Sequence, residues 1–246
     1  MKKFLWFTNI ITLVVLIYIS AHYKVPQKAF NRVFHKTTMH KDSFHTECLY
    51  DLKNFDFHHT LECDTPSILM LGNSIISHGD WPTLLNRKDI INRGISGDNL
   101  SCMCQRLKYL HDAHAKIWFI EGGTNDLPRR KVADMFANYK TIVEYVKAEH
   151  SIPVINLIIY ISPIVGIKFP TRADYKKING QIKELNTQLI LYAKANHIDY
   201  IDLNKVVADE NDILKDEYTI DGVHLNEKGY KEWSALINKI LVKNNI

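Results

Sequence analysis

The sequence predicts an α/β domain in which an open, parallel, five-stranded sheet lies between two layers of helices. Short apolar segments alternate with amphipathic segments of helical period over most of the chain. Segments that are apolar on both faces fit a parallel sheet covered on both sides, and the βαβ alternation favours an open, doubly wound arrangement. The length of 246 residues suits one such domain with some additional sequence.

Five segments are predicted to be strands because each is short and apolar on both faces. They span residues 67–72, 89–93, 116–122, 153–161 and 198–203. Four helices are predicted from apolar residues that recur every three or four positions, as on a core-facing helix surface. They span residues 98–113, 132–149, 172–196 and 226–243, and residues 165–171 are predicted to form a loop beside the sheet.

The N-terminus is predicted to be a membrane anchor rather than part of the domain. Lys2 and Lys3 precede the uncharged residues 4–21, a run that is close to the minimum for a membrane span. Ile19 would occupy the −3 position of a cleavage site after Ala21, where a small residue is preferred. An uncleaved signal anchor is therefore favoured over a cleaved signal peptide and a secreted product.

The predicted organisation is an anchor over residues 1–23, a juxtamembrane linker over residues 24–64 and a folded domain over residues 65–246. The count of basic residues flanking the span favours a cytoplasmic domain. A short basic tag before an apolar run is instead typical of export, and we expect the domain outside the cytoplasm, in the periplasm or at the cell surface. The basic segment 24–41 fits either contact with anionic headgroups or a solvated linker.

Charge and cysteine content restrict the possible functions. Residues 1–41 contain seven basic residues and no acidic one, so residues 42–246 carry a net charge of −3. Without a basic stripe carrying interleaved aromatic residues, nucleic-acid binding is not expected. Cys48 and Cys63 could pair in an exported domain, whereas Cys102 and Cys104 are predicted to be buried thiols on a helix. The histidines show no spacing typical of a metal site, and no metal or cofactor is predicted.

Polar residues follow the predicted strands at the points where ligands bind in such folds. Ser74 follows the first strand, Gly94 the second and Asn125 the third, while Asp221 and His224 precede the last helix. Each alone is compatible with an ordinary turn, helix cap or loop residue. Their joint occurrence at strand ends indicates a catalytic site.

These residue types together are suited to acyl transfer. A serine hydroxyl needs a base, and an imidazole held by a carboxylate is an effective one, which assigns Ser74, His224 and Asp221 to a triad. A developing oxyanion needs donors, which the backbone N–H groups of Ser74 and Gly94 and the amide of Asn125 could supply.

Four sequence blocks resemble those of the SGNH/GDSL hydrolase family, in the family's order. They read LGNSI (71–75), NRGISGD (92–98), GGTND (122–126) and DGVHLNEKGY (221–230). The residues in these blocks are similar to those of the family branch that contains platelet-activating-factor acetylhydrolase-like proteins and carbohydrate O-acetylesterases. The Gly-x-Ser-x-Gly motif of ordinary α/β-hydrolases is absent.

The resemblance covers about residues 66–243 and implies a three-layer, flavodoxin-like α/β/α sandwich that hydrolyses esters without metal or cofactor. It implies that Ser74 is the nucleophile and an oxyanion donor, that Gly94 and Asn125 complete the oxyanion hole, and that Asp221 and His224 complete the triad. Asn73 stands where the family usually has aspartate. We expect activity to survive this change, with altered charge beside the nucleophile.

The expected function is hydrolysis of short-chain acyl esters, mainly acetyl esters, on a glycan or a small molecule. A lysophospholipase or thioesterase acting near the membrane, an acyltransferase and a non-catalytic glycan-binding module on the same fold are alternatives. The sequence of the predicted loop, residues 165–171, does not indicate which acyl group the substrate carries. The sequence also does not indicate the oligomeric state.

Overall fold

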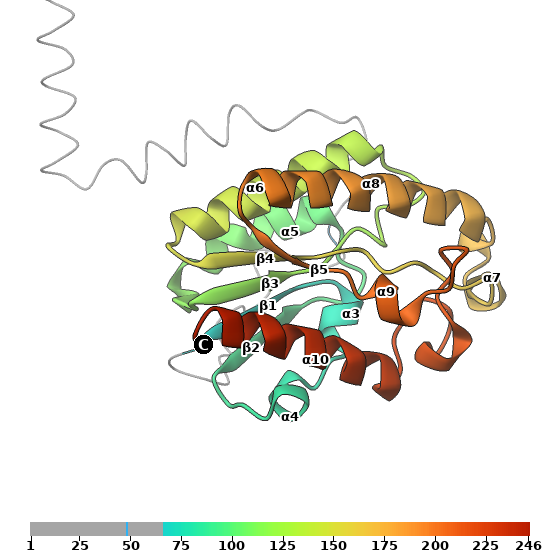
Figure 1. Cartoon of the computed structure of the whole chain (residues 1–246). Helices are drawn as coiled ribbons and strands as arrows, with labels where there is room; N and C mark the ends of the chain where they lie inside the picture. Colours follow the sequence, from blue (N-terminus) through green and yellow to red (C-terminus); the bar gives the residue numbers. More distant parts are fainter. Residues whose placement is uncertain (1–47, 49–65) are drawn as a thin grey trace, which may run out of the picture. The chain divides into compact units, whose positions relative to one another are not determined.

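The computed structural model describes Cys48 and residues 66–246, apart from the side chain of Asp112. Its centre is a five-stranded sheet in the order β2-β1-β3-β4-β5, with every pair parallel (Figure 1). The strands are β1 (Ile68–Gly72), β2 (Ile90–Gly94), β3 (Ile117–Ile120), β4 (Ile152–Asn156) and β5 (Asp199–Ile201). The strand order reverses between β1 and β3, so the carboxyl ends of these two strands flank the crevice where such folds bind ligands.

Helices cover both faces of the sheet, which confirms the three-layer arrangement (Figure 1). One layer contains α5 (Leu100–Arg106), α6 (Val132–Ala148) and α8 (Tyr175–Ala195). The other contains α3 (Ser74–Ser77), α4 (Trp81–Leu85), α9 (Asn204–Val207) and α10 (Glu227–Lys243). The remaining helical turns are η1 (Leu107–Tyr109), η2 (His111–Ala113), α7 (Val165–Lys168), η3 (Pro170–Arg172) and η4 (Asp216–Tyr218).

The alternation of side chains along β1 shows why the strand is apolar throughout. Leu69 and Leu71 pack into the cluster formed with α5, α6 and α8, whereas Ile68 and Met70 pack into the cluster formed with α3, α4 and α10. All four side chains are fully buried. Successive strand residues point to opposite faces, so a strand covered on both sides has no position for a solvated side chain.

The predicted strand 153–161 is too long, because β4 ends at Asn156. Leu157 still donates its N–H to the carbonyl of Ile201 in β5, but Ile158, Tyr160 and Ile161 donate to asparagine side chains instead. Ile158 donates to Asn186 and Ile161 to Asn179, each at 2.9 Å, and the same two amides donate back to the carbonyls of Ile158 and Ile161. A buried backbone needs such partners. The segment is thus apolar and buried without being a strand.

Two further segments differ from the sequence prediction. The predicted helix 98–113 is shorter: α5 begins after Asn99, whose side chain accepts the N–H of Cys102, and it is followed by the turns η1 and η2. The predicted loop 165–171 contains the helical turns α7 and η3, and the N–H of Phe169 donates to the carbonyl of Val165.

The cysteine pairing also differs from the expectation. Cys48 forms a disulfide with Cys102, and their Cα atoms are 5.7 Å apart, a separation that disulfides commonly span. Cys102 is therefore not a thiol, whereas Cys104 is free and half-buried. Cys63, the predicted partner of Cys48, lies outside the described residues.

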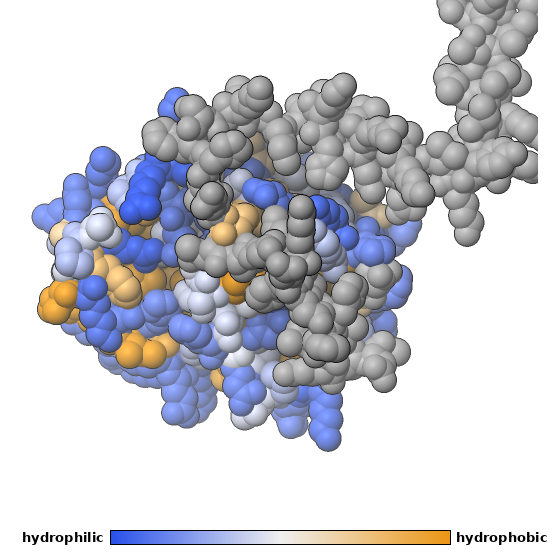
Figure 2. All heavy atoms as spheres, turned by 180° about the vertical axis from the view of Figure 1, so that it is seen from behind, coloured by the Kyte–Doolittle hydropathy of each residue, from blue (hydrophilic) through white to orange (hydrophobic). Residues whose placement is uncertain are grey.

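No helix within the described residues is long and apolar enough to cross a membrane. The predicted anchor, and the predicted linker apart from Cys48, lie outside that part of the chain. The face shown in Figure 2 is largely hydrophilic where it is coloured, with hydrophobic patches between the polar regions. This agrees with a domain that uses most of its apolar residues in the two clusters beside the sheet.

Candidate active site

Ser74 lies at the carboxyl end of β1, where a tight turn converts the strand into α3. Asn73 caps this helix, because its Oδ1 accepts the N–H of Ile75 at 2.8 Å. A Cβ atom at Gly72 would overlap the carbonyl oxygen of Glu121 and the side chain of Ile76. The Gly-Asn-Ser sequence therefore permits β3 and α3 to approach the turn closely, and it places Ser74 at the edge of the sheet.

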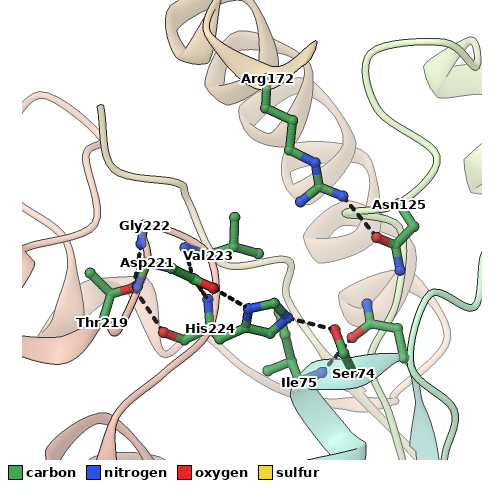
Figure 3. A network of polar contacts seen from close by, with 10 residues as sticks. Ser74, Ile75, Asn125, Arg172, Thr219, Asp221, Gly222, Val223 and His224 are labelled. Carbon is green, nitrogen blue, oxygen red and sulfur yellow. Dashed lines mark hydrogen bonds and ion pairs between the residues drawn. The ribbon is translucent and has the colours of Figure 1, made fainter. Parts of the chain in front are cut away.

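Ser74, His224 and Asp221 form one continuous chain of hydrogen bonds (Figure 3). The Oγ atom of Ser74 lies 2.9 Å from Nε2 of His224, and Nδ1 of His224 lies 2.7 Å from Oδ2 of Asp221. In a neutral ring, a proton on Nδ1 that is donated to the carboxylate leaves Nε2 to accept the serine hydroxyl. These separations are those that a general base requires.

The carboxylate of Asp221 is held by its own loop. Its Oδ1 accepts the backbone N–H groups of Val223 at 3.0 Å and His224 at 2.9 Å. Burial acts to raise the pKa of Asp221, but the hydrogen bonds from the backbone and ring of His224 and from Val223 outweigh it and lower that pKa below its ordinary value. Asp221 therefore remains ionised and can stabilise a protonated His224.

Thr219 fixes the loop that carries these two residues. Its hydroxyl donates to the carbonyl of His224 at 2.8 Å and accepts the N–H of Gly222 at 2.9 Å (Figure 3). Gly222 has a φ of +88°, and a Cβ atom there would lie 2.6 Å from the backbone nitrogen of Val165. A left-handed conformation with so little space favours glycine, so this position joins the catalytic loop tightly to α7.

Asn125 follows β3 and lies across from the triad (Figure 3). Its Nδ2 donates to the carbonyl of Asp98 at 2.8 Å, and its Oδ1 accepts Nη2 of Arg172, also at 2.8 Å. An amide nitrogen carries two hydrogens, so one donor remains for a substrate. The N–H of Ser74 donates to no other described residue, which leaves it available as well.

Gly94 does not have the oxyanion role that the sequence predicts for it. Its N–H donates to Oδ1 of Asn92 at 2.9 Å and is therefore already used. The absence of a Cβ serves packing, since a Cβ there would overlap the backbone of Ile76 and Ser77 in α3. This contact, rather than donation to a substrate, explains the glycine.

Gly97 has an unused backbone N–H in the same loop, and it was not among the site residues predicted from the sequence. It has a φ of +80° in the loop after β2, and its N–H donates to no residue that the structure describes. The next residue, Asp98, accepts the amide of Asn125 through its carbonyl, which ties this loop to the oxyanion donor. The signal available in the sequence was a turn glycine directly before Asp98.

Asn73 lies beside a fully buried carboxyl group, that of Glu121 at the end of β3. Burial raises the pKa of Glu121 to about 8, and the amide of Asn73 partly opposes that rise. The Asn73 amide acts on Glu121 as a hydrogen-bond donor, although neither carboxyl oxygen accepts a bond of close geometry from the described residues. Asn73 keeps the helix cap and adds no second carboxyl group beside Glu121.

Two side chains from the segment over the site approach the catalytic groups. The Phe169 ring lies 6.5 Å, centroid to centroid, from the ring of His224, and the guanidinium of Arg172 lies 5.7 Å from the Phe169 ring centroid. The ring of His78, the residue that ends α3, lies 5.1 Å from that of His224, centroid to centroid. None of these contacts was predicted, and those of Phe169 and Arg172 depend on how the segment after β4 returns over the sheet edge.

A serine, a histidine and an aspartate in one hydrogen-bond chain are the arrangement of the serine hydrolases, which recurs on several folds. The chain matches the model of the GDSL-like lipase/acylhydrolase family over residues 70–232, which include Ser74, Asn125, Asp221 and His224. It belongs to this family, and it is a hydrolase. Among curated proteins, none matches the chain.

Several solved structures are similar to this one. A GDSL-like lipase from Bacteroides thetaiotaomicron has 25% sequence identity and a TM-score of 0.67, over 79% of this chain and 100% of that chain. A carbohydrate esterase family 3 protein from Talaromyces cellulolyticus has 18% identity and a TM-score of 0.55, over 73% and 97%. An acetyl xylan esterase has 18% identity and a TM-score of 0.58, over 71% and 98%. The last two support the fold.

Proposed function

We propose that this protein is a serine esterase that hydrolyses short-chain acyl esters, chiefly acetyl esters, on a carbohydrate. The observation that carries the proposal is the hydrogen-bond chain from Ser74 through His224 to Asp221, with Asn125 across from it. The similar fold of a carbohydrate esterase and an acetyl xylan esterase supports the choice of substrate.

The reaction has two steps. His224 removes the proton of Ser74 as Oγ attacks the ester carbonyl, and Asp221 stabilises the imidazolium. The alcohol leaves with the proton from His224, and an acyl-enzyme remains. Water, deprotonated by His224, then attacks the acyl-enzyme, releases the carboxylic acid and restores Ser74.

The negative oxygen that forms in both steps needs fixed donors. The N–H groups of Ser74 and Gly97 and the remaining hydrogen of the Asn125 amide would supply them. Gly97 replaces Gly94 in this role, because the N–H of Gly94 is bound to Asn92.

The positions of Phe169 and Arg172 support the proposal that the acyl group is small. Phe169 lies beside His224, and Arg172 is bonded to Asn125, so both occupy space next to the reacting atoms. A long acyl chain would have to pass these side chains. We therefore expect hydrolysis to fall sharply as the acyl chain lengthens, in contrast to a lysophospholipase or thioesterase.

The proposal includes an anchor at residues 1–23 and a catalytic domain, residues 65–246, outside the cytoplasm. The Cys48–Cys102 disulfide supports this location, because disulfides persist in oxidising compartments. Denatured chain isolated from its native membrane without reductant should then show two reactive thiols among its four cysteines. Four reactive thiols would contradict the proposed location.

The function is tested on the full chain in detergent with acetylated sugars and with nitrophenyl esters of increasing acyl length. Ser74→Ala and His224→Ala should abolish hydrolysis while circular dichroism shows an intact fold. Asn125→Ala should lower kcat by about 10²–10³-fold, the usual loss for one oxyanion donor. Turnover by Ser74→Ala at the wild-type rate would refute the assignment.

A further inference from the structure

Arg172 lies at the oxyanion side of the candidate site, yet the proposed reaction gives it no role. It is the last residue of η3, and Figure 3 shows its guanidinium reaching toward Asn125 from the segment over the site. Its Nη2 donates to Oδ1 of Asn125 at 2.8 Å, and the side chain is half-buried. An arginine in this position brings a permanent positive charge close to the ester.

The charge of Arg172 is not balanced by an ion pair with any described residue. Three other arginines each face an aspartate: Arg87 with Asp89 at 2.7 Å, Arg106 with Asp98 at 2.8 Å and Arg130 with Asp126 at 3.2 Å. By contrast, the acid that acts on Arg172 is Asp221, which is already bonded to His224.

The electrostatic environment of Arg172 is unfavourable for a cation. Burial lowers the pKa of Arg172, the repulsion from Arg129 lowers it further, and the attraction of Asp221 opposes both. Arg129 is exposed and adds a second positive charge close to Arg172. Residues 42–246 carry a net charge of −3, so this positive region is local and not a property of the whole domain.

The guanidinium is held in one orientation while most of its donors remain unused. One of its five N–H donors binds Asn125, and the ring of Phe169 lies 5.7 Å from the guanidinium carbon. A planar guanidinium that is fixed in this way matches carboxylate and phosphate oxygens, which it can bind with two parallel hydrogen bonds.

We propose that Arg172 binds an anionic group of the substrate, so that the preferred substrate is an ester of an acidic carbohydrate with a carboxylate, sulfate or phosphate near the acyl group. This inference rests on the proposed esterase function. An anion at Arg172 would neutralise the unpaired charge and would fix the ester relative to Asn125 and Ser74. Arg172 is thus a residue that determines specificity.

The test compares two acetylated sugars that differ in one group, an acetylated methyl glucoside and the corresponding methyl glucuronoside. The full chain should show a kcat/KM at least about 10-fold higher for the glucuronoside. Arg172→Gln should reduce this ratio by about 10–100-fold, the usual range for a hydrogen bond to a charged group. Arg172→Lys keeps the charge without the planar fork and should give an intermediate ratio.

A second pair of substrates locates the anion. Mono-4-nitrophenyl succinate carries a carboxylate on the acyl side, and 4-nitrophenyl butyrate is its neutral counterpart of similar length. A preference for the succinate that Arg172→Gln removes would place the anionic group on the acyl chain rather than the sugar. In either pair the preference should decrease as salt increases, because ions screen an attraction between partly exposed charges.

Lys194→Gln is the matched control. Lys194 is exposed in the last turn of α8, just before β5 begins, at the sheet edge opposite to the site. Its substitution changes the net charge equally and should leave both ratios at the wild-type value. If Arg172→Gln lowers kcat/KM equally for charged and neutral esters, Arg172 only positions Asn125 and the inference is wrong.

The two proposals fail in different ways. Ser74-dependent hydrolysis without a preference for either anionic ester overturns the role of Arg172 and leaves the esterase function intact. Absence of Ser74-dependent hydrolysis of all four esters and of the wider panel overturns the esterase function itself.

Discussion

Asn73 shows how a single departure from a family pattern can be compatible with the same local structure. Its side chain caps α3 by accepting the N–H of Ile75, a bond that an aspartate oxygen could also accept. The difference lies on the other side of the residue, where Glu121 is fully buried. An amide there avoids a second carboxyl group beside the first.

Asn73→Asp should therefore destabilise the protein, and more strongly as the pH rises. Two adjacent buried carboxyl groups cannot both ionise without a large energetic cost, so the substitution should be tolerated best at pH 5 and worst at pH 8. The melting temperatures of the wild type and the variant, measured across this range, test the effect. Asn73→Ser preserves a capping oxygen without charge and should show no such trend, and equal trends in both variants would contradict this explanation.

Residue-scale predictions from the sequence succeeded where the residue type itself specifies the chemistry. Ser74, His224 and Asp221 are brought into hydrogen-bonding distance, as their order after the strands predicted. Gly94 was assigned wrongly, because the absence of a side chain can serve packing as well as donation. Only the structure shows that a Cβ there would overlap α3 and that its N–H binds Asn92.

At the scale of elements, the loop from Thr219 to His224 holds the triad residues in place through its own hydrogen bonds. The N–H of Ile220 donates to the carbonyl of His224 at 2.9 Å, and the hydroxyl of Thr219 donates to the same carbonyl at 2.8 Å. The carbonyl of Gly222 accepts the N–H of Ser162 at 2.8 Å. The triad geometry thus depends on bonds within the loop and to the segment before α7.

Thr219→Val should disturb this support without touching the reacting atoms. The loss of the hydroxyl leaves the carbonyl of His224 and the N–H of Gly222 each with one partner fewer, which should cost about 1–3 kcal/mol in free energy of unfolding. A small displacement of His224 should lower kcat by about 10-fold or more, because reacting groups must be closely aligned. Denaturant unfolding and ester kinetics measure the two effects.

Thr219→Ser supplies the control, since it retains the hydroxyl and loses only a methyl group. It should stay near the wild type in both kcat and stability. A Thr219→Val variant with wild-type kcat would show that the loop holds His224 without this hydroxyl.

The elements that the sequence did not predict share a physical cause. The segment after β4 is buried and apolar, but its backbone is satisfied by Asn179 and Asn186 of α8 and by Asn204, which accepts the N–H of Tyr160 at 2.9 Å. Periodicity identifies burial and does not identify the hydrogen-bond partner. A strand and a segment held by side-chain amides therefore show the same apolar pattern in the sequence.

At the scale of the whole molecule, the layered architecture was predictable and the cross-link was not. Apolar strands that alternate with amphipathic helices restrict the chain to a covered parallel sheet, which the structure shows. The pairing of Cys48 with Cys102 depends on the separation of two Cα atoms that are 54 positions apart in sequence. Spacing along the chain carries no information about such a distance.

The pH dependence of global stability should reflect the buried carboxyl of Glu121. Its ordinary pKa is 4.5, and burial raises the pKa to about 8 in the folded protein, against the opposing effect of Asn73. At pH values between 4.5 and about 8, Glu121 has released its proton in the unfolded chain and retains it in the folded protein. The folded state then binds more protons, so the free energy of unfolding falls as the pH rises, by at most about 1.4 kcal/mol per pH unit for this group.

Glu121→Gln removes this titration and should flatten the pH profile. The stabilisation from Glu121 is complete below pH 4.5 and is lost as the pH rises through about 8, so the variant should gain on the wild type steadily between pH 5 and 8. Burial raises the pKa of Asp126 to about 7, but this group titrates in both proteins and cancels in the difference. Burial and the charge of Glu121 raise the pKa values of Tyr139 and Tyr230 well above this range.

Denaturant unfolding of both proteins at pH 5, 6, 7 and 8 measures the difference directly. A difference in the free energy of unfolding between the two proteins that widens by about 1 kcal/mol per pH unit would show that Glu121 titrates with a raised pKa in the folded protein. This carboxyl group lies directly behind the turn that carries Ser74. Parallel profiles would mean that Glu121 ionises as readily in the folded protein as in the unfolded chain. In that case Glu121 would already be ionised at neutral pH, beside the amide of Asn73.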